Sequence, residues 1–382
     1  MGRRYLFIDQ GRAVPNAALG HVRVKHALAV GLSEQALQPG ERLDHIDVPT
    51  FGRAGRVLTR FFPRLGRWGF GSLRWHLVRS SMARTIVRDA ARSADPPAVV
   101  HVTTDQVGLL LGRRMQRRTP CVLSLDVLTI DWVRMKRRIP LGPPAPFFLR
   151  PIGTLERRAL RSAPLNIAWT ETVARQIKAL QPRARVITLH PGLDIEAFAP
   201  GRTAPGDDLL HVLFIGGRWV AKGGPSLVEA LGDRLGQDVV LDVVTTDEVA
   251  ERNGLTLHRA SPGSTTIRDL LRAADLLCLP TQVDAVPWVV LEAMATGIPV
   301  LSTTVGSIPE MLAAASPRPC GLVVPPSDVV ALKAALKRLL DDPDLRVELG
   351  RAGRARAVET YDARVNAPKL LDALRNVALG RA

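Results

Sequence analysis

The chain has 382 residues, of which 46% are apolar, and its formal net charge is +16. The length predicts two domains, and the apolar content excludes an intrinsically disordered chain. The chain has three widely separated cysteines, Cys121, Cys278 and Cys320. Their spacing excludes a disulfide framework and a structural zinc site, and it favours a reducing compartment.

No apolar stretch is long enough for a signal-peptide core or a spanning helix. The first run, residues 5–8, ends at Asp9, and the longest run, residues 286–301, contains Glu292. A spanning helix needs about 18 uninterrupted apolar residues. We therefore expect a cytoplasmic protein that does not cross a membrane, although it can be peripheral on the inner face of the plasma membrane.

The positive charge is confined to the first half of the chain. Residues 1–200 contain 32 Lys and Arg against 14 Asp and Glu, whereas residues 201–382 contain 20 against 22. A GC-rich genome explains the use of arginine in place of lysine, but it does not explain the missing acids. The asymmetry predicts an anionic partner for the N-terminal half.

Short β-branched runs alternate with helical stretches along the chain, which predicts an α/β architecture with parallel sheets. Strands are expected at residues 5–8, 98–102, 121–125, 166–169, 210–215, 239–245, 276–279 and 300–302. Helices are expected at residues 20–31, 155–162, 171–180, 226–235, 266–274, 288–296 and 329–341.

A segment of turn formers at residues 200–208 predicts the boundary between the two domains. Residues 1–200 then form an N-terminal, basic, acceptor-binding domain, and residues 201–382 form a C-terminal domain that binds a nucleotide sugar. The last helix can pack back on the N-terminal domain. We expect two Rossmann-like, doubly wound domains that face one another across a cleft, with ligands outside the carboxyl ends of the strands.

A glycine-rich turn follows the strand expected at residues 210–215, in the sequence LHVLFIGGRWVAKGGP. Glycines such as Gly217 allow the backbone to approach a ligand closely. Arg218 and Lys222 place two cations after the strand, and a diphosphate is their natural complement. The alternative is a solvated loop with two ordinary basic residues.

A second polar loop follows the strand expected at residues 276–279. Asp284 resembles an N-cap, Pro287 suits a helix start, and free N–H groups near Val286 would attract a phosphate. Glu292 lies two turns inside the expected helix, between apolar neighbours that rarely tolerate a carboxylate without a polar partner. The alternative is a capping Asp284 and an exposed Glu292 on a surface helix.

These segments resemble the family 4 retaining glycosyltransferases of GT-B fold, also described as glycosyl transferases group 1. The acid at Asp284, seven residues and then EAMATGIPV from Glu292 match that family's signature. The segment FIGGRWVAKGG is similar to its arginine–lysine phosphate loop. Further similar segments, in the family's order, are HPGLDIEAFAP, VGSIPEML and CGLVVPPSD.

The resemblance implies a role for each residue of this site. Arg218 and Lys222 would bind the donor diphosphate without a metal or another cofactor, because the nucleotide sugar is itself the co-substrate. Glu292 would hold the ribose hydroxyls, and Asp284 would contact the transferred sugar. Asp284 stands where many members have glutamate, and this shorter side chain can alter the choice of sugar.

The resemblance is weaker in the N-terminal half. Gly20 fits the family's glycine loop near the donor phosphates, and His21 is either a surface residue at a helix start or a chemical group. Asp126 follows the strand expected at residues 121–125, where many relatives have a histidine. It is expected either to act as a base or hydroxyl-binding group, or to cap a turn.

Residues 53–92 contain ten arginines and one acid, Asp89, with five aromatic residues among them. Such a mixture favours the headgroup layer of an anionic membrane, and residues 135–149 have a similar character. The alternatives are a solvated basic helix and a surface for an acidic glycan. Nucleic-acid binding is not expected, because no motif for it is present.

The combined hypothesis is a retaining enzyme that moves a hexose-like sugar from a UDP- or GDP-sugar to a hydroxyl of a glycan or lipid-linked acceptor of the cell envelope. Base recognition is expected in the loops at residues 245–248 and 259–263. The alternatives within this fold are a sugar-nucleotide hydrolase, a sugar phosphorylase and a non-catalytic protein that binds the nucleotide sugar or a glycan.

Overall fold

A computed structural model describes residues 3–9, 25–26, 28–32, 37–48, 70–103, 108–136, 146–201 and 209–381. Gly20, His21 and the first part of the arginine-rich run lie outside these residues. The chain forms two compact units, of which unit 1 comprises Met1–Gly192 with Ala363–Ala382 and unit 2 comprises Leu193–Asp362. The turn-rich segment that begins at residue 200 therefore lies inside unit 2, and the last helix lies in unit 1.

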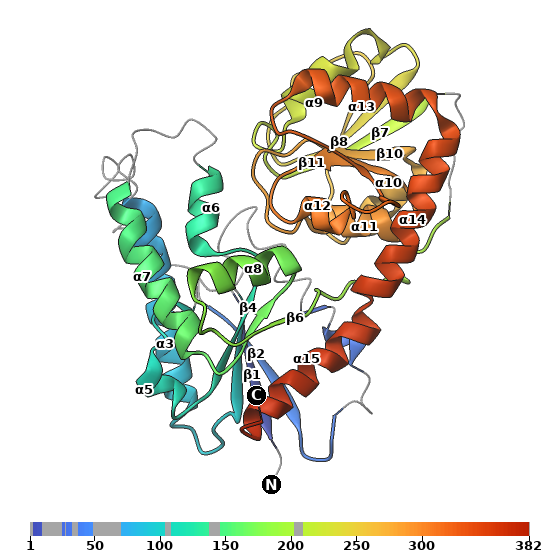
Figure 1. Cartoon of the computed structure of the whole chain (residues 1–382). Coiled ribbons are helices and arrows are strands. Elements are labelled where there is room, and N and C mark those ends of the chain that lie inside the picture. Colours follow the sequence, from blue (N-terminus) through green and yellow to red (C-terminus); the bar gives the residue numbers. More distant parts are fainter. Residues whose placement is uncertain are drawn as a thin grey trace. The chain divides into compact units, whose positions relative to one another are not determined.

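Unit 1 is a six-stranded parallel sheet in the order β2-β1-β3-β4-β5-β6, with helices on both faces (Figure 1). Its strands are β1 Arg4–Asp9, β2 Arg42–Asp47, β3 Val99–Thr103, β4 Cys121–Leu125, β5 Asn166–Ala168 and β6 Val186–Thr188. Its helices are α3 Phe70–Ala90, α5 Arg113–Gln116, α6 Thr129–Lys136, α7 Pro146–Ser162, α8 Glu171–Leu180 and α15 Ala363–Ala378.

The alternation of side chains in β1 builds the two cores of unit 1. Leu6 and Ile8 pack in one core with residues of α3, α7 and α8. Tyr5 and Phe7 pack in the other core with the apolar stripe of α15, which includes Leu374. The C-terminal helix therefore buries a whole face of the unit 1 sheet.

A buried ion pair joins α15 to the segment before β2. Arg375 donates to both carboxylate oxygens of Glu41, at 3.1 and 2.6 Å, and the Glu41 side chain is only 3% exposed. Tyr5 donates its hydroxyl to the same carboxylate at 2.9 Å. Burial by itself raises the pKa of Glu41, but the hydrogen bonds from Arg375, the Gln38 N–H and Tyr5, with the Arg375 charge, outweigh it and lower that pKa.

Unit 2 is a second six-stranded parallel sheet, in the order β12-β11-β10-β7-β8-β9. Its strands are β7 Leu210–Ile215, β8 Val239–Val244, β9 Leu255–His258, β10 Leu276–Leu279, β11 Val300–Thr303 and β12 Leu322–Val324. Its helices are α9 Gly224–Leu231, η3 Gly232–Arg234, α10 Thr265–Ala273, α11 Trp288–Thr296, α12 Ile308–Met311, α13 Val329–Asp341 and α14 Pro343–Tyr361.

The chain order of unit 2 reverses direction between β7 and β10. Leu277 of β10 is in register with Leu213 of β7 and with Val300 of β11, so these three strands end at one edge. Helices α9 and α13 pack together on one face, and α10, α11 and α14 lie on the other (Figure 1). In open α/β sheets, ligands bind outside the carboxyl ends of the strands at such a reversal.

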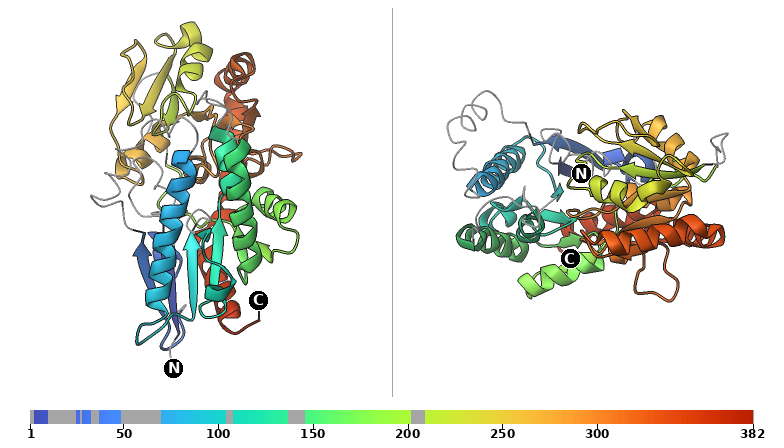
Figure 2. Two further views of the ribbon diagram at one scale, coloured as in Figure 1. Left: turned by 90° about the vertical axis from the view of Figure 1, so that its left-hand side faces the viewer. Right: turned by 90° about the horizontal axis from the view of Figure 1, so that it is seen from above.

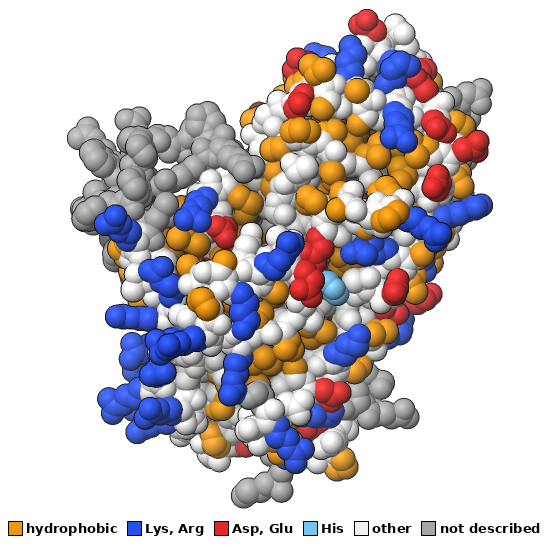
Figure 3. All heavy atoms as spheres, in the orientation of Figure 1, with side chains coloured by type: hydrophobic (Ala, Val, Ile, Leu, Met, Phe, Trp, Pro, Cys, Tyr) orange, Lys and Arg blue, Asp and Glu red, His pale blue; other side chains and the backbone are white. Residues whose placement is uncertain are grey.

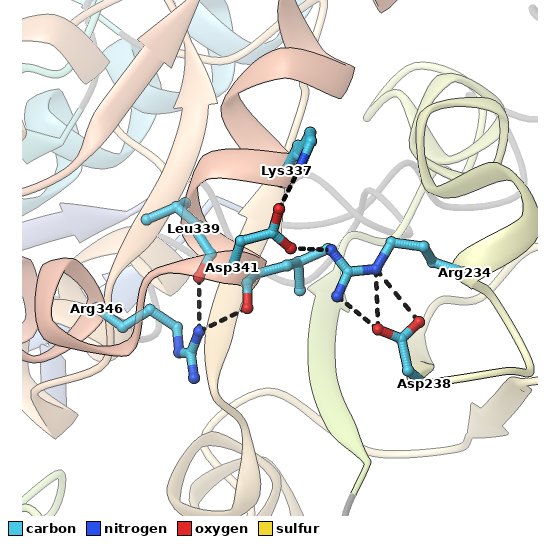
Figure 4. Close-up of polar contacts among 7 residues, drawn as sticks. Arg234, Asp238, Lys337, Leu339, Asp341 and Arg346 are labelled. Carbon is cyan, nitrogen blue, oxygen red and sulfur yellow. Dashed lines mark hydrogen bonds and ion pairs between the residues drawn. The ribbon is translucent and has the colours of Figure 1, made fainter.

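An ion-pair network joins η3 and the residue before β8 to the end of α13 (Figure 4). The Arg234 guanidinium donates to Asp238 at 2.5–3.2 Å and to Asp341 at 2.6 Å. Arg346 donates to two carbonyl oxygens at the end of α13, at 2.7 and 3.0 Å, and so caps it. No helix in the described part of the chain combines the length and the apolar character that membrane spanning requires.

Candidate functional site

The loop from β7 to α9 is held tightly against the end of β10. Gly223, the N-cap of α9, has a φ of +83°, and a Cβ there would lie 2.0 Å from the Pro280 carbonyl oxygen. The helix begins at Gly224, and Pro225 is its second residue. Only glycine fits at position 223, because a side chain would have to displace the backbone that follows β10.

Two residues after β8 clamp the same loop on both sides of Arg218. The Thr246 hydroxyl donates to the Gly217 carbonyl oxygen at 2.5 Å, and the Asp247 carboxylate accepts from the Trp219 N–H at 2.8 Å. The Arg218 side chain is exposed between these two bonds. Sequence reasoning assigned residues 245–248 to base recognition and missed this clamp, for which the sequence signal is a polar pair directly after a buried strand.

The clamp extends to the next strand. After β9, the Arg259 guanidinium donates to the Thr245 carbonyl oxygen at 2.9 Å. Hydrogen bonds therefore connect the loops that follow β9, β8 and β7 in the order in which these strands lie in the sheet. The position of Arg218 is set by this connected edge and not by its own loop alone.

The structure brings Lys222 and Asp284 together across the reversal between β7 and β10. The Lys222 ammonium forms an ion pair with the Asp284 carboxylate and also donates to the Val283 carbonyl oxygen at 3.0 Å. Their side chains are 22% and 15% exposed. A cation and an acid that lie 62 positions apart in the sequence thus form one charged pair at the carboxyl edge of the sheet.

The loop before α11 is also anchored by backbone contacts. Gly306 has a φ of +59°, and a Cβ there would lie 2.4 Å from the Asp284 carbonyl oxygen. The Ser307 N–H donates to the Ala285 carbonyl oxygen at 3.0 Å, and Val286 is buried. The N-cap of α11 is Pro287, so the expectation that Asp284 caps this helix is wrong. The Asp284 carboxylate instead pairs with Lys222.

Glu292 is buried in the middle of α11, with 1% of its surface exposed. The alternative of a glutamate exposed on a surface helix is therefore wrong. A carboxylate in such an apolar setting is costly unless it has polar or cationic partners. Its burial makes Glu292 a candidate for a built polar site.

Asp126 directly follows β4 in unit 1 and is partly exposed. The first N–H groups of α6 donate to the carboxylate of Glu156, which is fully buried. The distances are 2.5 Å from the Thr129 nitrogen and 3.3 Å from the Ile130 nitrogen. Glu156 therefore caps the start of α6. Sequence reasoning missed Glu156 because it lies 27 positions after Thr129.

Two cavities lie among the described residues. The larger, about 430 Å³, lies in unit 2 between Trp219, the first turns of α9 and residues 249–255. The smaller, about 40 Å³, lies in unit 1 and has a polar lining that includes His101, Ser124 and His190. Neither of these two cavities is lined by the Lys222–Asp284 pair or by Glu292.

Residues 248–356 match the family model described as glycosyl transferases group 1. This part of the chain is therefore similar to that family. The matched range includes Asp284, Val286 and Glu292, whereas Gly217, Arg218 and Lys222 precede it. The resemblance that the sequence motifs indicated is therefore confirmed.

Curated proteins with glycosyltransferase names are similar to this chain. It is 33% identical over 151 residues to MMP alpha-(1->4)-mannosyltransferase from Mycolicibacterium hassiacum, a match that covers 37% of this chain and 36% of that protein. The chain spans 36%, 66% and 44% of the lengths of three curated relatives, which is less than two thirds in each case.

Solved structures share the fold of the whole chain. Sucrose-phosphate synthase from Thermosynechococcus elongatus has a TM-score of 0.72 at 17% identity, over 99% of this chain and 100% of that one. Anabaena HepE in complex with UDP-glucose has a TM-score of 0.66 at 16% identity, over 98% and 99%. The two six-stranded parallel sheets are thus those of a GT-B fold, as the sequence predicts.

Proposed function

We propose that this protein transfers a hexose-like sugar from a nucleoside-diphosphate sugar, UDP- or GDP-linked, to an acceptor hydroxyl with retention of the anomeric configuration. The observation that carries the proposal is the Lys222–Asp284 ion pair at the reversal between β7 and β10, in a chain that matches the group 1 family model. The donor diphosphate can bind beside the Lys222 cation, and hydroxyls of the sugar can bind beside the Asp284 carboxylate.

Each residue of the unit 2 site has a part in the proposed transfer. Arg218 and Lys222 bind the diphosphate and stabilise the charge that develops on it as the sugar leaves, with no metal required. The backbone at Gly217 and Val286 approaches the phosphates, as the close packing of both loops permits. Glu292 holds the ribose, and Asp284 accepts hydrogen bonds from the transferred sugar.

Unit 1 contributes the acceptor side of the proposal. Asp126 binds or deprotonates the acceptor hydroxyl, and Gly20, which lies outside the described residues, approaches the donor phosphates. The acceptor is a lipid-linked or cell-envelope glycan, reached from the cytoplasmic side. The name of the mannosyltransferase relative supports sugar transfer to another sugar, and the HepE complex supports a UDP-linked donor.

The first experiment identifies the donor by thermal shift. UDP, GDP and their common hexose derivatives are added at large excess, and the true donor raises the melting temperature according to RT ln(1 + [L]/Kd). Turnover is then followed as nucleotide release with a panel of glycan acceptors. If neither UDP nor GDP nor their sugar derivatives raise the melting temperature, the proposal is overturned. If a nucleotide sugar raises the melting temperature but no acceptor in the panel gives turnover, a non-catalytic binding protein is favoured.

The second experiment tests the two cations. Lys222→Ala and Arg218→Ala are each expected to lower turnover at least about a hundredfold, because one charged donor in such a site is worth roughly 3 kcal/mol of transition-state stabilisation. Arg318→Ala removes an exposed arginine of the same unit and serves as the control. Near-normal turnover in either site variant, with the melting temperature unchanged, would refute the assigned roles.

A further inference from the structure

One face of unit 1 is covered with arginine. It is formed by α3 with Arg92 after it, by α5 with its C-terminal turn, and by α7. Eleven arginines are exposed there: Arg84, Arg88, Arg92, Arg113, Arg114, Arg117, Arg118, Arg150, Arg157, Arg158 and Arg161. We call this set the arginine face. Asp89 is the one exposed acid on these three helices, since Glu156 is buried.

The charge of the arginine face is not neutralised within the described part of the chain. Among those residues, Arg88 is the one member whose guanidinium has a carboxylate partner, with Asp89 at 3.2 Å. Elsewhere in unit 1, Arg42 is paired with Asp95 at 2.5 Å. Within the described part of the chain, ten guanidinium groups of the arginine face thus lie at the surface without a carboxylate partner.

The arginine face is broad and flat. Helices α3 and α7 contact one another and run side by side along unit 1 (Figures 1 and 2). With 21 and 17 residues, they are about 30 and 25 Å long. Arg150, Arg157 and Arg161 follow one another at helical spacing and form a stripe of about 16 Å along α7.

Among the side chains that the structure describes on α3, α5 and α7, none is a large exposed hydrophobic group. In Figure 3, lysine and arginine side chains gather over these helices with few acids among them. Neither of the two cavities described above opens on them. Over its described side chains, the surface therefore offers charge without an exposed aromatic group on which bases or sugars could stack.

We propose that the arginine face is an electrostatic docking surface for an anionic lipid bilayer. A broad array of guanidinium groups on neighbouring helices matches a plane of phosphate headgroups, whereas a nucleic acid or a glycan chain is better held in a groove with stacking side chains. The surface differs from the sequence expectation, which centred on residues 53–92. Arg79 of that run is buried, and α5 and α7 supply eight of the eleven arginines.

The test is vesicle flotation of the full chain with phosphatidylcholine alone and with phosphatidylcholine containing 30% phosphatidylglycerol. Binding is expected only to the anionic vesicles, and it is expected to fall steeply between about 50 and 300 mM salt as screening increases. One surface arginine contributes about a fivefold change in membrane partition. The variant R113Q/R114Q/R117Q/R118Q is therefore expected to bind at least a hundredfold more weakly.

A charge-matched control separates this face from net charge. The variant R318Q/K333Q/R338Q/R351Q removes four exposed cations from unit 2 and is expected to bind vesicles within twofold of the wild type. Equal losses in the two variants, or equal binding to neutral and anionic vesicles, would overturn the proposal. Duplex DNA that displaces the protein from vesicles at equimolar phosphate would instead identify a nucleic-acid surface. The donor thermal shift is unchanged in either variant, so this result is independent of the proposed function.

Discussion

Replacing Gly223 by alanine tests whether the close approach of the β7 and β10 loops builds the site. The substitution has two costs, of which the first is the positive φ of +83°, worth about 1–3 kcal/mol for a residue with a side chain. The second is steric, because the new Cβ would lie 2.0 Å from the Pro280 carbonyl oxygen, where contacts below 3.0 Å essentially do not occur. The two loops must therefore separate by about 1 Å.

A displacement of about 1 Å can cost about a hundredfold in rate when it misplaces catalytic groups. Gly223→Ala is thus expected to weaken donor binding at least tenfold and to lower turnover about a hundredfold. Gly232→Ala is the matched control, since Gly232 has a φ of +56° in the same unit but no atom within 4 Å of a Cβ. It is expected to lose only the conformational cost, measured by urea unfolding, and to bind the donor normally. Equal donor binding by the two variants would refute the reasoning.

Three further predictions concern Asp247, Glu41 and the three cysteines. Asp247→Ala removes the acceptor of the Trp219 N–H beside Arg218, and is expected to weaken nucleotide binding about tenfold by calorimetry, whereas Asp247→Asn keeps an acceptor and restores most of it. Glu41→Gln breaks the buried pair with Arg375 and is expected to cost about 3 kcal/mol of unfolding free energy at pH 7. Because the pKa of Glu41 is lowered in the folded state, this difference is full above the unfolded pKa of about 4.5 and disappears as pH falls through the folded value, so an undiminished difference at pH 3 would contradict it. Burial raises the pKa of the thiols of Cys121, Cys278 and Cys320, to about 12 for Cys121 and about 11 for Cys320. The native protein is therefore expected not to react with Ellman's reagent at pH 8 until it is denatured.

The strands that sequence analysis missed are the edge strands of the two sheets. All eight expected strands are present, and six of them have the same bounds or differ by one residue at one end, whereas β2, β6, β9 and β12 were not predicted. Edge strands are covered on fewer sides, so they need no continuous apolar run. The sequence RLDHID of β2 shows this, because its charged side chains give no strand signal although it pairs fully with β1.

None of the four longest helices, α3, α7, α14 and α15, was predicted with its full bounds. The bounds of α8, α11 and α13 were predicted correctly, because α8 and α13 carry an apolar stripe and α11 is apolar nearly all round, each between turn signals. Helix α3 carries arginines on its outer face and buries polar residues such as Arg79, so the run was interpreted as a membrane-binding segment. Local sequence identifies a helix when its buried face is apolar, but not when that face is polar.

The site was predicted as a set of residues, but its pairings were not. The positions of Lys222 and Asp284 after neighbouring strands follow from the motif and from the parallel topology. Which cation meets which acid depends on two loop conformations that only Gly223 and Gly306 permit, and these are long-range backbone contacts. For the same reason the polar pair Thr246 and Asp247 after β8 does not by itself predict that these residues hold the loop of Arg218.

The two cations that the sequence presents as equivalent are physically different in the structure. An ammonium has three N–H donors, and Lys222 gives one to Asp284 and one to the Val283 carbonyl oxygen, so one remains for a phosphate. A diphosphate can therefore bind Lys222 without breaking its ion pair, and the reorganisation cost is small. The Asp284 charge, however, offsets that of Lys222. The uncompensated attraction for an anion then comes from Arg218, whose side chain is exposed and whose backbone is clamped on both sides. Lys222 supplies a fixed position and Arg218 supplies net charge, which is why the loss of either is expected to be severe.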